Sequence, residues 1–112
     1  SMTVQVPIET RHGVHTVPVS SIIMVEAQGK KVIVHTTARD YESIHTMQYW
    51  LDQLPVNRFF QTHRSFIINY EHITDFDHML VHLSNGQFTA YLTKRKYSAF
   101  KGAYLLYLES TR

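Results

Sequence analysis

Residues 59–73 read FFQTHRSFIINYEHI, a stretch in which polar residues interrupt two apolar runs and place His63 beside Arg64. If this were one continuous strand, Arg64 would share a face with Phe60, where an unpaired guanidinium is costly to bury. We therefore predict that the strand ends near Thr62 and that the polar residues form a turn. A guanidinium held on a turn can bind a phosphate or a guanine edge through two hydrogen bonds. For the neighbouring His63 there is a simpler alternative to ligand binding, in which the ring packs inside the protein and bonds to nearby backbone.

A second group of cations opens a predicted C-terminal helix. The helical spacing comes from aromatic residues at Tyr97, Phe100, Tyr104 and Tyr107. Thr93 can cap this helix, so its first turn would consist of Lys94, Arg95 and Lys96. The N-terminal end of a helix carries about half a positive charge, and each cation there costs a few tenths to ~1 kcal/mol. Either the long side chains extend into water, or an anion such as a phosphate docks at this end.

The cations are distributed unevenly along the chain. Net charge is only +2 and the sequence pI is about 9.0, which is a weak indication of an anionic partner. However, residues 27–39, 53–70 and 78–108 contain no Asp or Glu, and they hold three, two and four of the 11 Lys and Arg residues. Any one of these segments could be ordinary solvated surface. Three of them together favour a basic face that meets phosphates.

Eight histidines raise the alternative of a metal protein or an enzyme. His12 and His15 are three residues apart, and His78 and His82 are four apart. Residues 78–82 read HMLVH, however, and on a strand residues four apart lie roughly 13 Å from each other. The glutamate of the zinc hydrolase motif, a nucleophile elbow and a phosphate-binding loop are all missing from the sequence. We therefore predict no metal, no cofactor and no enzymatic activity.

Closely spaced strands must position these residues. Turn signals recur between short apolar runs, and Asn85-Gly86 is the strongest of them, since both residues tolerate the positive φ of a type I′ hairpin turn. This pattern predicts a mainly β, antiparallel fold. The predicted strands are 4–9, 14–17, 22–26, 31–36, 41–44, 59–61, 66–69, 73–77, 79–83 and 87–92.

One further segment has helical spacing. In residues 46–54, TMQYWLDQL, apolar side chains recur at i, i+3, i+4 and i+7. Thr46 is the predicted N-cap and Pro55 ends the helix.

The chain of 112 residues fits one domain, which we place at residues 3–109, after a Ser1-Met2 pair that resembles a cloning remnant. Cysteine is absent, which excludes disulfides. There is no run of 18 apolar residues and no signal-peptide pattern, so the sequence predicts a cytoplasmic protein without a membrane partner.

The motifs taken together resemble the LytTR DNA-binding domain family. FFQTHRSFIINYEHI resembles the signature of that family, namely an aromatic pair, His-Arg-Ser, an apolar triplet, Asn and a later Ile. SSIIMVEAQGKKVIVHT resembles its upstream strand pair with a glutamate, here Glu26, before the turn. TMQYWLDQLPVNRFF and LSNGQFTAYLTKRKYSAFKGAYL resemble its first helix and its final hairpin and helix. The resemblance covers the chain from about Val4 to Leu108.

The resemblance implies an elongated antiparallel fold with one or two short helices, whose loops enter successive major grooves of duplex DNA. The positions that read bases in the family correspond here to Lys30, Arg64 and Arg95. Each lies in one of the three acid-free segments. Contacts to the DNA backbone are expected from Lys31, Arg58, His63, Ser65, Thr93, Lys94 and Lys96.

Residues 93 and 94 depart from the family pattern, and Asn69 matches it with an expected structural role. Thr93-Lys94 stands where many members have Ser-Arg, so a hydroxyl and a cation are kept but the bidentate fork is lost. Asn69 is expected to form structural hydrogen bonds rather than to read a base.

The family further implies the C-terminal effector domain of a two-component response regulator. Such a protein has a receiver domain and binds direct-repeat sites, with two copies forming a homodimer on the DNA. The alternative is a protein-interaction module or a domain that binds nucleic acid non-specifically or as single strands, because aromatics near cations can stack on bases.

Overall fold

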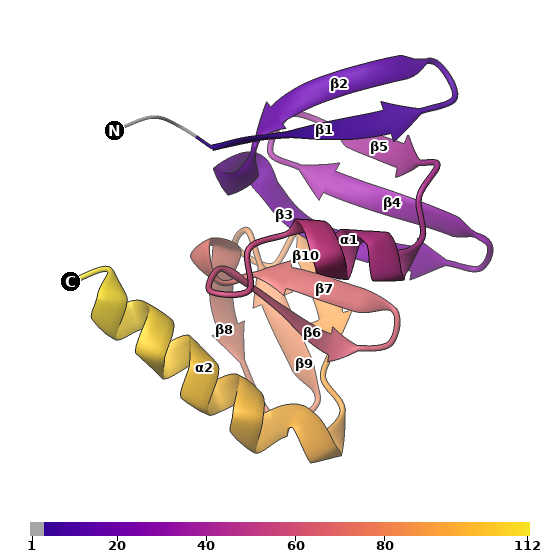
Figure 1. The fold of residues 1–112 in the computed structure, drawn as a ribbon. Coiled ribbons are helices and arrows are strands. Elements are labelled where there is room, and N and C mark those ends of the chain that lie inside the picture. Colours follow the sequence, from indigo (N-terminus) through magenta and orange to yellow (C-terminus); the bar gives the residue numbers. More distant parts are fainter. Residues whose placement is uncertain (1–3) are drawn as a thin grey trace.

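The computed structural model describes residues 4–112 as three antiparallel sheets with two α-helices (Figure 1). The strands are β1 (Gln5–Thr10), β2 (Gly13–Pro18), β3 (Ile22–Gln28), β4 (Lys31–Thr36), β5 (Asp40–Ser43), β6 (Phe59–His63), β7 (Phe66–Asn69), β8 (Ile73–Phe76), β9 (Leu80–Leu83) and β10 (Phe88–Tyr91). The helices are α1 (Met47–Gln53), α2 (Tyr97–Ser110) and the short 3₁₀ turns η1 (Val19–Ser21), η2 (Tyr70–His72) and η3 (Lys94–Lys96). The predicted mainly β, antiparallel class is confirmed.

A central five-stranded sheet, in the order β5-β4-β3-β7-β6, separates two cores. Neighbouring residues on β7 enter different cores, because successive side chains on a strand point to opposite faces. In the first core, Ile67 packs with Trp50 of α1 and Ile8 of β1. In the second core, Ile68 packs with Val81 of β9 and Phe100 of α2. Burial on both faces explains why the apolar runs of β3 and β7 are continuous rather than alternating.

The helix α1 begins where the sequence predicts. Thr46 lies at the N-cap with extended backbone, and its hydroxyl oxygen accepts a hydrogen bond from the Tyr49 backbone N–H at 3.1 Å. The helix ends at Gln53, two residues before Pro55.

The connection between β9 and β10 differs from the prediction. We predicted a two-residue turn at Asn85-Gly86, but Phe88 pairs with Leu83, so four residues connect the strands. Positive φ angles occur at Ser84 (53°), Asn85 (58°) and Gly86 (84°). Two successive backbone hydrogen bonds, Gly86 N–H to Leu83 O and Gln87 N–H to Ser84 O, form overlapping turns. Asn85 and Gly86 are therefore the central pair of the second turn only.

Asn69 has the structural role that we predicted for it. Its side chain is fully buried, its Nδ2 donates to the Ile22 carbonyl at 2.8 Å, and its Oδ1 accepts from the Glu71 backbone N–H at 2.9 Å. The amide thus links β3 to the 3₁₀ turn after β7.

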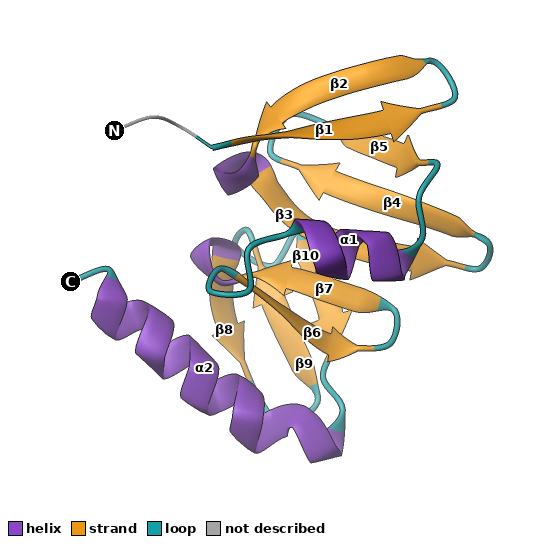
Figure 2. Cartoon of the chain, viewed as in Figure 1, coloured by secondary structure: helices purple, strands orange, loops and turns teal. Residues whose placement is uncertain are grey.

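The helix α2 packs on the second core through aromatic side chains. Figure 2 shows the helix next to the part of the molecule that holds β6 and β8. Phe100 is fully buried, with its ring centroid 5.0 Å from that of Phe76 and 5.4 Å from that of Phe60. Tyr97, Tyr104 and Tyr107 pack around the same cluster. The helical spacing of the aromatics therefore serves packing.

Tyr70 makes the free energy of unfolding depend on pH in the alkaline range. Its side chain is buried, and burial raises the pKa of its hydroxyl from the ordinary 10.0 to about 12. Between these values the unfolded chain loses the proton while the folded chain keeps it, so stability falls as pH rises from about 10 to about 12. The loss from this residue should be roughly 2–3 kcal/mol. Urea unfolding across this range measures it, and Tyr70→Phe should lose less stability than the wild type. An equal loss in both proteins would contradict the assignment.

None of the helices within residues 4–112 is long and apolar enough to cross a membrane.

Candidate nucleic-acid interface

The turn between β6 and β7 presents Arg64. β6 continues to His63, one residue beyond the predicted end, and only Arg64 and Ser65 separate it from β7. The pairing shifts register between Gln61 and His63, so Thr62 is an inserted residue whose side chain is fully buried. Arg64 is exposed. The predicted turn is therefore confirmed at Arg64 and Ser65, whereas Gln61, Thr62 and His63 belong to the strand and not to the turn.

His63 shapes this turn from within the protein. Its Nδ1 lies 3.0 Å from the backbone N of Ser65 and accepts that hydrogen bond, so a neutral ring carries its proton on Nε2. The ring also contacts Phe66 and Tyr91 edge-on, at centroid distances of 5.8 and 5.7 Å. Of the two alternatives for this histidine, the packed residue bonded to nearby backbone is observed. Nε2 remains available as a donor to a ligand.

The turn between β3 and β4 presents Lys30 and Lys31, both exposed. Gln28 pairs with Lys31, which leaves Gly29 and Lys30 as a two-residue connection. Gly29 has a φ of 63°, a left-handed conformation that costs glycine little and other residues more.

Glu26 supports the strands that carry this turn. Its Oε1 lies 3.1 Å from Gln28 Nε2 and 2.8 Å from His35 Nε2. The other ring nitrogen of His35 lies 2.8 Å from Asp40 Oδ1. The glutamate of the family pattern thus has a structural position beside the turn, through a buried histidine that links β3, β4 and β5.

The third group of cations follows β10. Lys94, Arg95 and Lys96 form the 3₁₀ turn η3, and α2 begins only at Tyr97. The prediction that they form the first turn of the α-helix was therefore wrong in its boundary. Thr93 lies at the N-cap of η3, but its hydroxyl makes no capping hydrogen bond. The 3₁₀ turn is closed instead by backbone, since the Lys96 N–H donates to the Thr93 carbonyl.

Hydrogen bonds join the three turns into one surface. The Ala27 N–H at the end of β3 donates to the Ser65 carbonyl at 2.9 Å, and the Thr93 N–H donates to the Thr62 carbonyl at 3.0 Å. Lys96 Nζ donates to the Gln61 carbonyl at 3.0 Å. In Figure 1 the β3–β4 turn, the β6–β7 turn and the connection from β10 to α2 follow one another along the same side of the molecule. We call residues 28–31, 63–65 and 93–96 the basic edge.

Arg58 lies away from the basic edge, contrary to our expectation. It precedes β6 whereas Arg64 follows it, and six residues of extended chain span roughly 20 Å. Arg58 Nη2 is bonded to Glu71 Oε1 at 2.9 Å, next to the 3₁₀ turn η2. This pair has a structural role at the opposite end of the sheet.

The cations of the basic edge have no acidic partners. Within residues 4–112, Lys and Arg side chains form only two ion pairs, Arg58–Glu71 and Arg112–Glu109. Lys30, Arg64 and Arg95 are exposed and belong to neither pair. Lys96 is the most enclosed cation of the edge: burial, and then the charge of Arg95, lower the pKa of its ammonium. A row of exposed, unpaired cations on tight turns can bind a polyanion.

The histidines do not gather into a metal site in the described residues. The two histidines of the HMLVH segment have different partners. His78 stacks on Tyr97 with ring centroids 4.0 Å apart, whereas His82 Nδ1 lies 2.7 Å from Asp75 Oδ1.

A row of exposed cations on tight turns is typical of nucleic-acid-binding domains. Residues 12–104 match the LytTr DNA-binding domain family, so the chain belongs to that family. The matched residues include all three turns of the basic edge.

Relatives of known description agree with this assignment. Sensory transduction protein LytR of Staphylococcus epidermidis is 31% identical over 72 residues, which is 64% of this chain and 29% of the relative. Transcriptional regulatory protein NatR of Bacillus subtilis is 28% identical over 109 residues, 93% of this chain and 47% of the relative. The chain thus spans less than half the length of either relative.

A solved structure is similar over nearly the whole chain. It is the LytTr DNA-binding domain of a protein described as a methyl-accepting/DNA response regulator from Bacillus cereus. It superposes with a TM-score of 0.74 and 27% sequence identity, covering 92% of this chain and 97% of that one.

Proposed function

We propose that this domain is the DNA-reading effector of a response regulator and that it recognises a specific duplex sequence through the basic edge. The observation that carries the proposal is the alignment of three exposed basic turns, held together by backbone hydrogen bonds, in a LytTr DNA-binding domain. Rigid presentation favours recognition, because a preorganised contact loses less entropy on binding.

The dimensions of the domain fit a duplex lying along the basic edge. The principal extents are 38 × 37 × 25 Å, so the domain is flat rather than elongated in one direction. One helical turn of B-DNA is about 34–36 Å long. The β3–β4 and β6–β7 turns are two strand spacings apart, about 10 Å. A domain 38 Å across, laid along the duplex, covers roughly one helical turn, which contact with successive major grooves requires.

The exposure and chemistry of each side chain in the basic edge indicate whether it contacts a base or a phosphate. Lys30, Arg64 and Arg95 carry exposed side chains at the tips, and we assign base edges to them. Arg64 and Arg95 can bind guanine O6 and N7 through a rigid planar fork, whereas Lys30 offers a single flexible ammonium. Arg58 is left out because of its position. Contacts to phosphates fall to Lys31, His63, Ser65, Thr93, Lys94 and Lys96.

Lys94 and Lys96 should be separable by experiment. Lys94 is exposed and unpaired, so Lys94→Ala should weaken binding to every duplex by the same factor and reduce the salt slope by about 0.9, without changing the melting temperature. Lys96→Ala should in addition lower stability by about 1 kcal/mol, because the Gln61 carbonyl loses its donor. Anisotropy titrations and thermal melts measure both effects. Equal melting temperatures for the two variants would contradict the structural role of Lys96.

The wider context of the domain follows from its family and is also proposed. The chain forms one DNA-binding domain over residues 3–109, works in the cytoplasm beside a receiver domain, and has no enzymatic activity. Two copies bind direct repeats side by side, as a homodimer assembled on the DNA.

Fluorescence anisotropy with duplex and single-stranded oligonucleotides of the same sequence tests the proposed function. The duplex should bind more tightly, because the aromatics of α2 pack in or around the second core and are not free to stack on bases. Tyr91, which is 58% exposed beside His63, is the aromatic best placed for stacking. Tyr91→Ala should leave duplex affinity within about twofold of the wild type. Preferential binding of single strands, lost on Tyr91→Ala, would favour the alternative function.

A further inference from the structure

A fourth basic turn lies beyond the basic edge. The hairpin of β1 and β2 closes through Arg11 and His12, both exposed. Figure 1 shows this turn on the same side of the molecule as the β3–β4 and β6–β7 turns. The family match begins at residue 12, so all of β1 and Arg11 lie outside it.

Contacts between strands place this turn in the same row. The end of β1 meets the end of β5, because the Ile44 N–H donates to the Glu9 carbonyl at 2.9 Å. His45 Nε2 also lies 2.7 Å from Glu9 Oε1. Since Ser43 pairs with Val32, this end of β5 lies beside the start of β4, where Lys31 stands. The row therefore continues from the β3–β4 turn, past the end of β5, to the β1–β2 turn.

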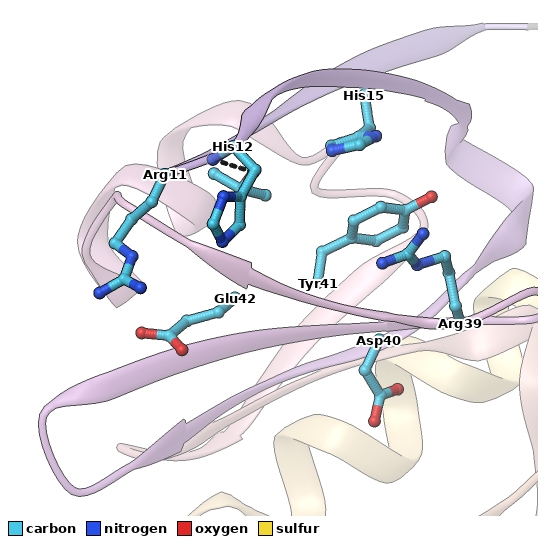
Figure 3. Close-up of a pocket in the computed structure, with 8 residues that line it drawn as sticks. Arg11, His12, His15, Arg39, Asp40, Tyr41 and Glu42 are labelled. Carbon is cyan, nitrogen blue, oxygen red and sulfur yellow. Dashed lines mark hydrogen bonds between the residues drawn. The ribbon is translucent and has the colours of Figure 1, made fainter.

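The tip is held without help from its basic side chains. Thr10 Oγ1 donates to the Gly13 carbonyl at 3.1 Å and accepts from the His12 backbone N–H at 3.1 Å, as the close-up in Figure 3 shows for the second bond. Ile8 of the same strand is fully buried in the first core. The turn is thus a fixed platform, and Arg11 can be replaced without loss of fold.

The surroundings of Arg11 leave its charge available. It belongs to none of the ion pairs formed by Lys and Arg within residues 4–112. Arg11 lines an open pocket of about 350 Å³ between the hairpin and β5, where Glu42 projects to the same side (Figure 3). Arg39 lines the other end of this pocket, with its guanidinium carbon 4.9 Å from the centre of the Tyr41 ring.

Position decides what Arg11 can reach. The β1–β2 turn is offset from the β3–β4 turn across β5, whose end bonds to β1 and lies beside the start of β4. On a duplex lying along the row, the groups beside a turn seated in the major groove are the phosphates that border the groove. Arg11, offset in this way, faces phosphates rather than base edges.

We infer that the β1–β2 turn is an additional DNA contact, in which Arg11 binds a backbone phosphate outside the groove read by the β3–β4 turn and His12 adds a second donor. The inference rests on the proposed function. It extends the footprint toward one flank of the site and contributes affinity without sequence selectivity, because phosphates carry no sequence information.

The test compares Arg11→Ala with Arg39→Ala, which removes the same charge from the far end of the same pocket. The site is first identified by selecting bound duplexes from a randomised pool. Each variant and the wild type are then titrated against a duplex that carries this site and against a scrambled duplex. Arg11→Ala should weaken binding to both duplexes equally and reduce the salt slope by about 0.9. Its disadvantage relative to the wild type should then shrink roughly threefold between about 50 and about 200 mM salt. Arg39→Ala should bind like the wild type.

A duplex-length series places the contact. Duplexes are shortened one base pair at a time from either flank of the site. The wild type should lose affinity when one particular flank is removed, and Arg11→Ala should not. If Arg11→Ala matches the wild type on all duplexes while the wild type still prefers its site, this inference is wrong and the proposed function stands. If the wild type does not distinguish the site from the scrambled duplex, the proposed function fails, and this inference fails with it.

Discussion

Replacing Phe100 with alanine should lower the free energy of unfolding by about 3–5 kcal/mol. The ring is fully buried, and the rings of Phe60, Phe76 and Tyr104 surround it. Its removal leaves a cavity between α2 and the sheet, because these neighbours belong to three different elements and cannot all move inward. Urea unfolding monitored by circular dichroism measures the loss.

Phe100→Ala should also weaken DNA binding, because α2 fixes the position of η3. The helix α2 follows η3 directly, so a loosened helix releases Arg95 from the row of turns. The matched control is Leu106→Ala on the same helix, since Leu106 is 73% exposed and should change stability by less than about 0.5 kcal/mol. A loss below about 1 kcal/mol for Phe100→Ala would mean that α2 contributes little to the second core.

Replacing Arg64 with alanine should weaken binding to the best duplex site by about 1–3 kcal/mol, or roughly 5- to 150-fold. Binding to random duplexes should weaken much less, so the specificity ratio should fall. The physical reason is that Arg64 is exposed on a two-residue turn whose backbone is fixed on both sides, by His63 and by the hydrogen bond from Ala27 to Ser65. Melting temperature should stay unchanged, because the side chain has no intramolecular ion pair among those of residues 4–112.

Arg64→Lys separates charge from geometry at this position. Lysine keeps the positive charge but lacks the planar fork, so the salt slope should stay while specificity falls. If Arg64→Ala weakened binding to the best site and to random DNA by the same factor, Arg64 would contact phosphate and the base-reading role would be wrong.

Local patterns in the sequence were sufficient for most elements. The bounds of β4 and β7 match the prediction, because each is a short apolar run between polar segments. The cap of α1 was also predictable, since a threonine before a helical repeat and a later proline mark both ends. For Arg64, the clash of a guanidinium with an apolar face was enough to predict a turn.

The errors occurred where distant segments decide the structure. Thr62 is buried as an inserted residue whose carbonyl binds Thr93, and nothing in the local sequence reveals that contact. The cations at residues 94–96 follow this contact and wind as a 3₁₀ turn before α2 starts. Arg58 was expected at the basic edge, but it precedes the strand that Arg64 follows, and its partner Glu71 comes from a 3₁₀ turn that we did not predict.

The role of Lys96 as a structural donor was also not predictable. Sequence placed it among exposed cations, but the packing of η3 against β6 directs its ammonium to the Gln61 carbonyl. Only the three-dimensional meeting of residues 35 positions apart creates this bond.

Selection from a randomised duplex pool at two salt concentrations tests the central claim most directly. The claim predicts an enriched direct-repeat motif that the wild type binds far more tightly than bulk DNA at both concentrations. Arg64→Ala, carried through the same selection, should enrich a motif with at least one position relaxed. A pool without any motif, with weak binding that modest salt abolishes, would contradict the claim and reduce the basic edge to a non-specific electrostatic surface.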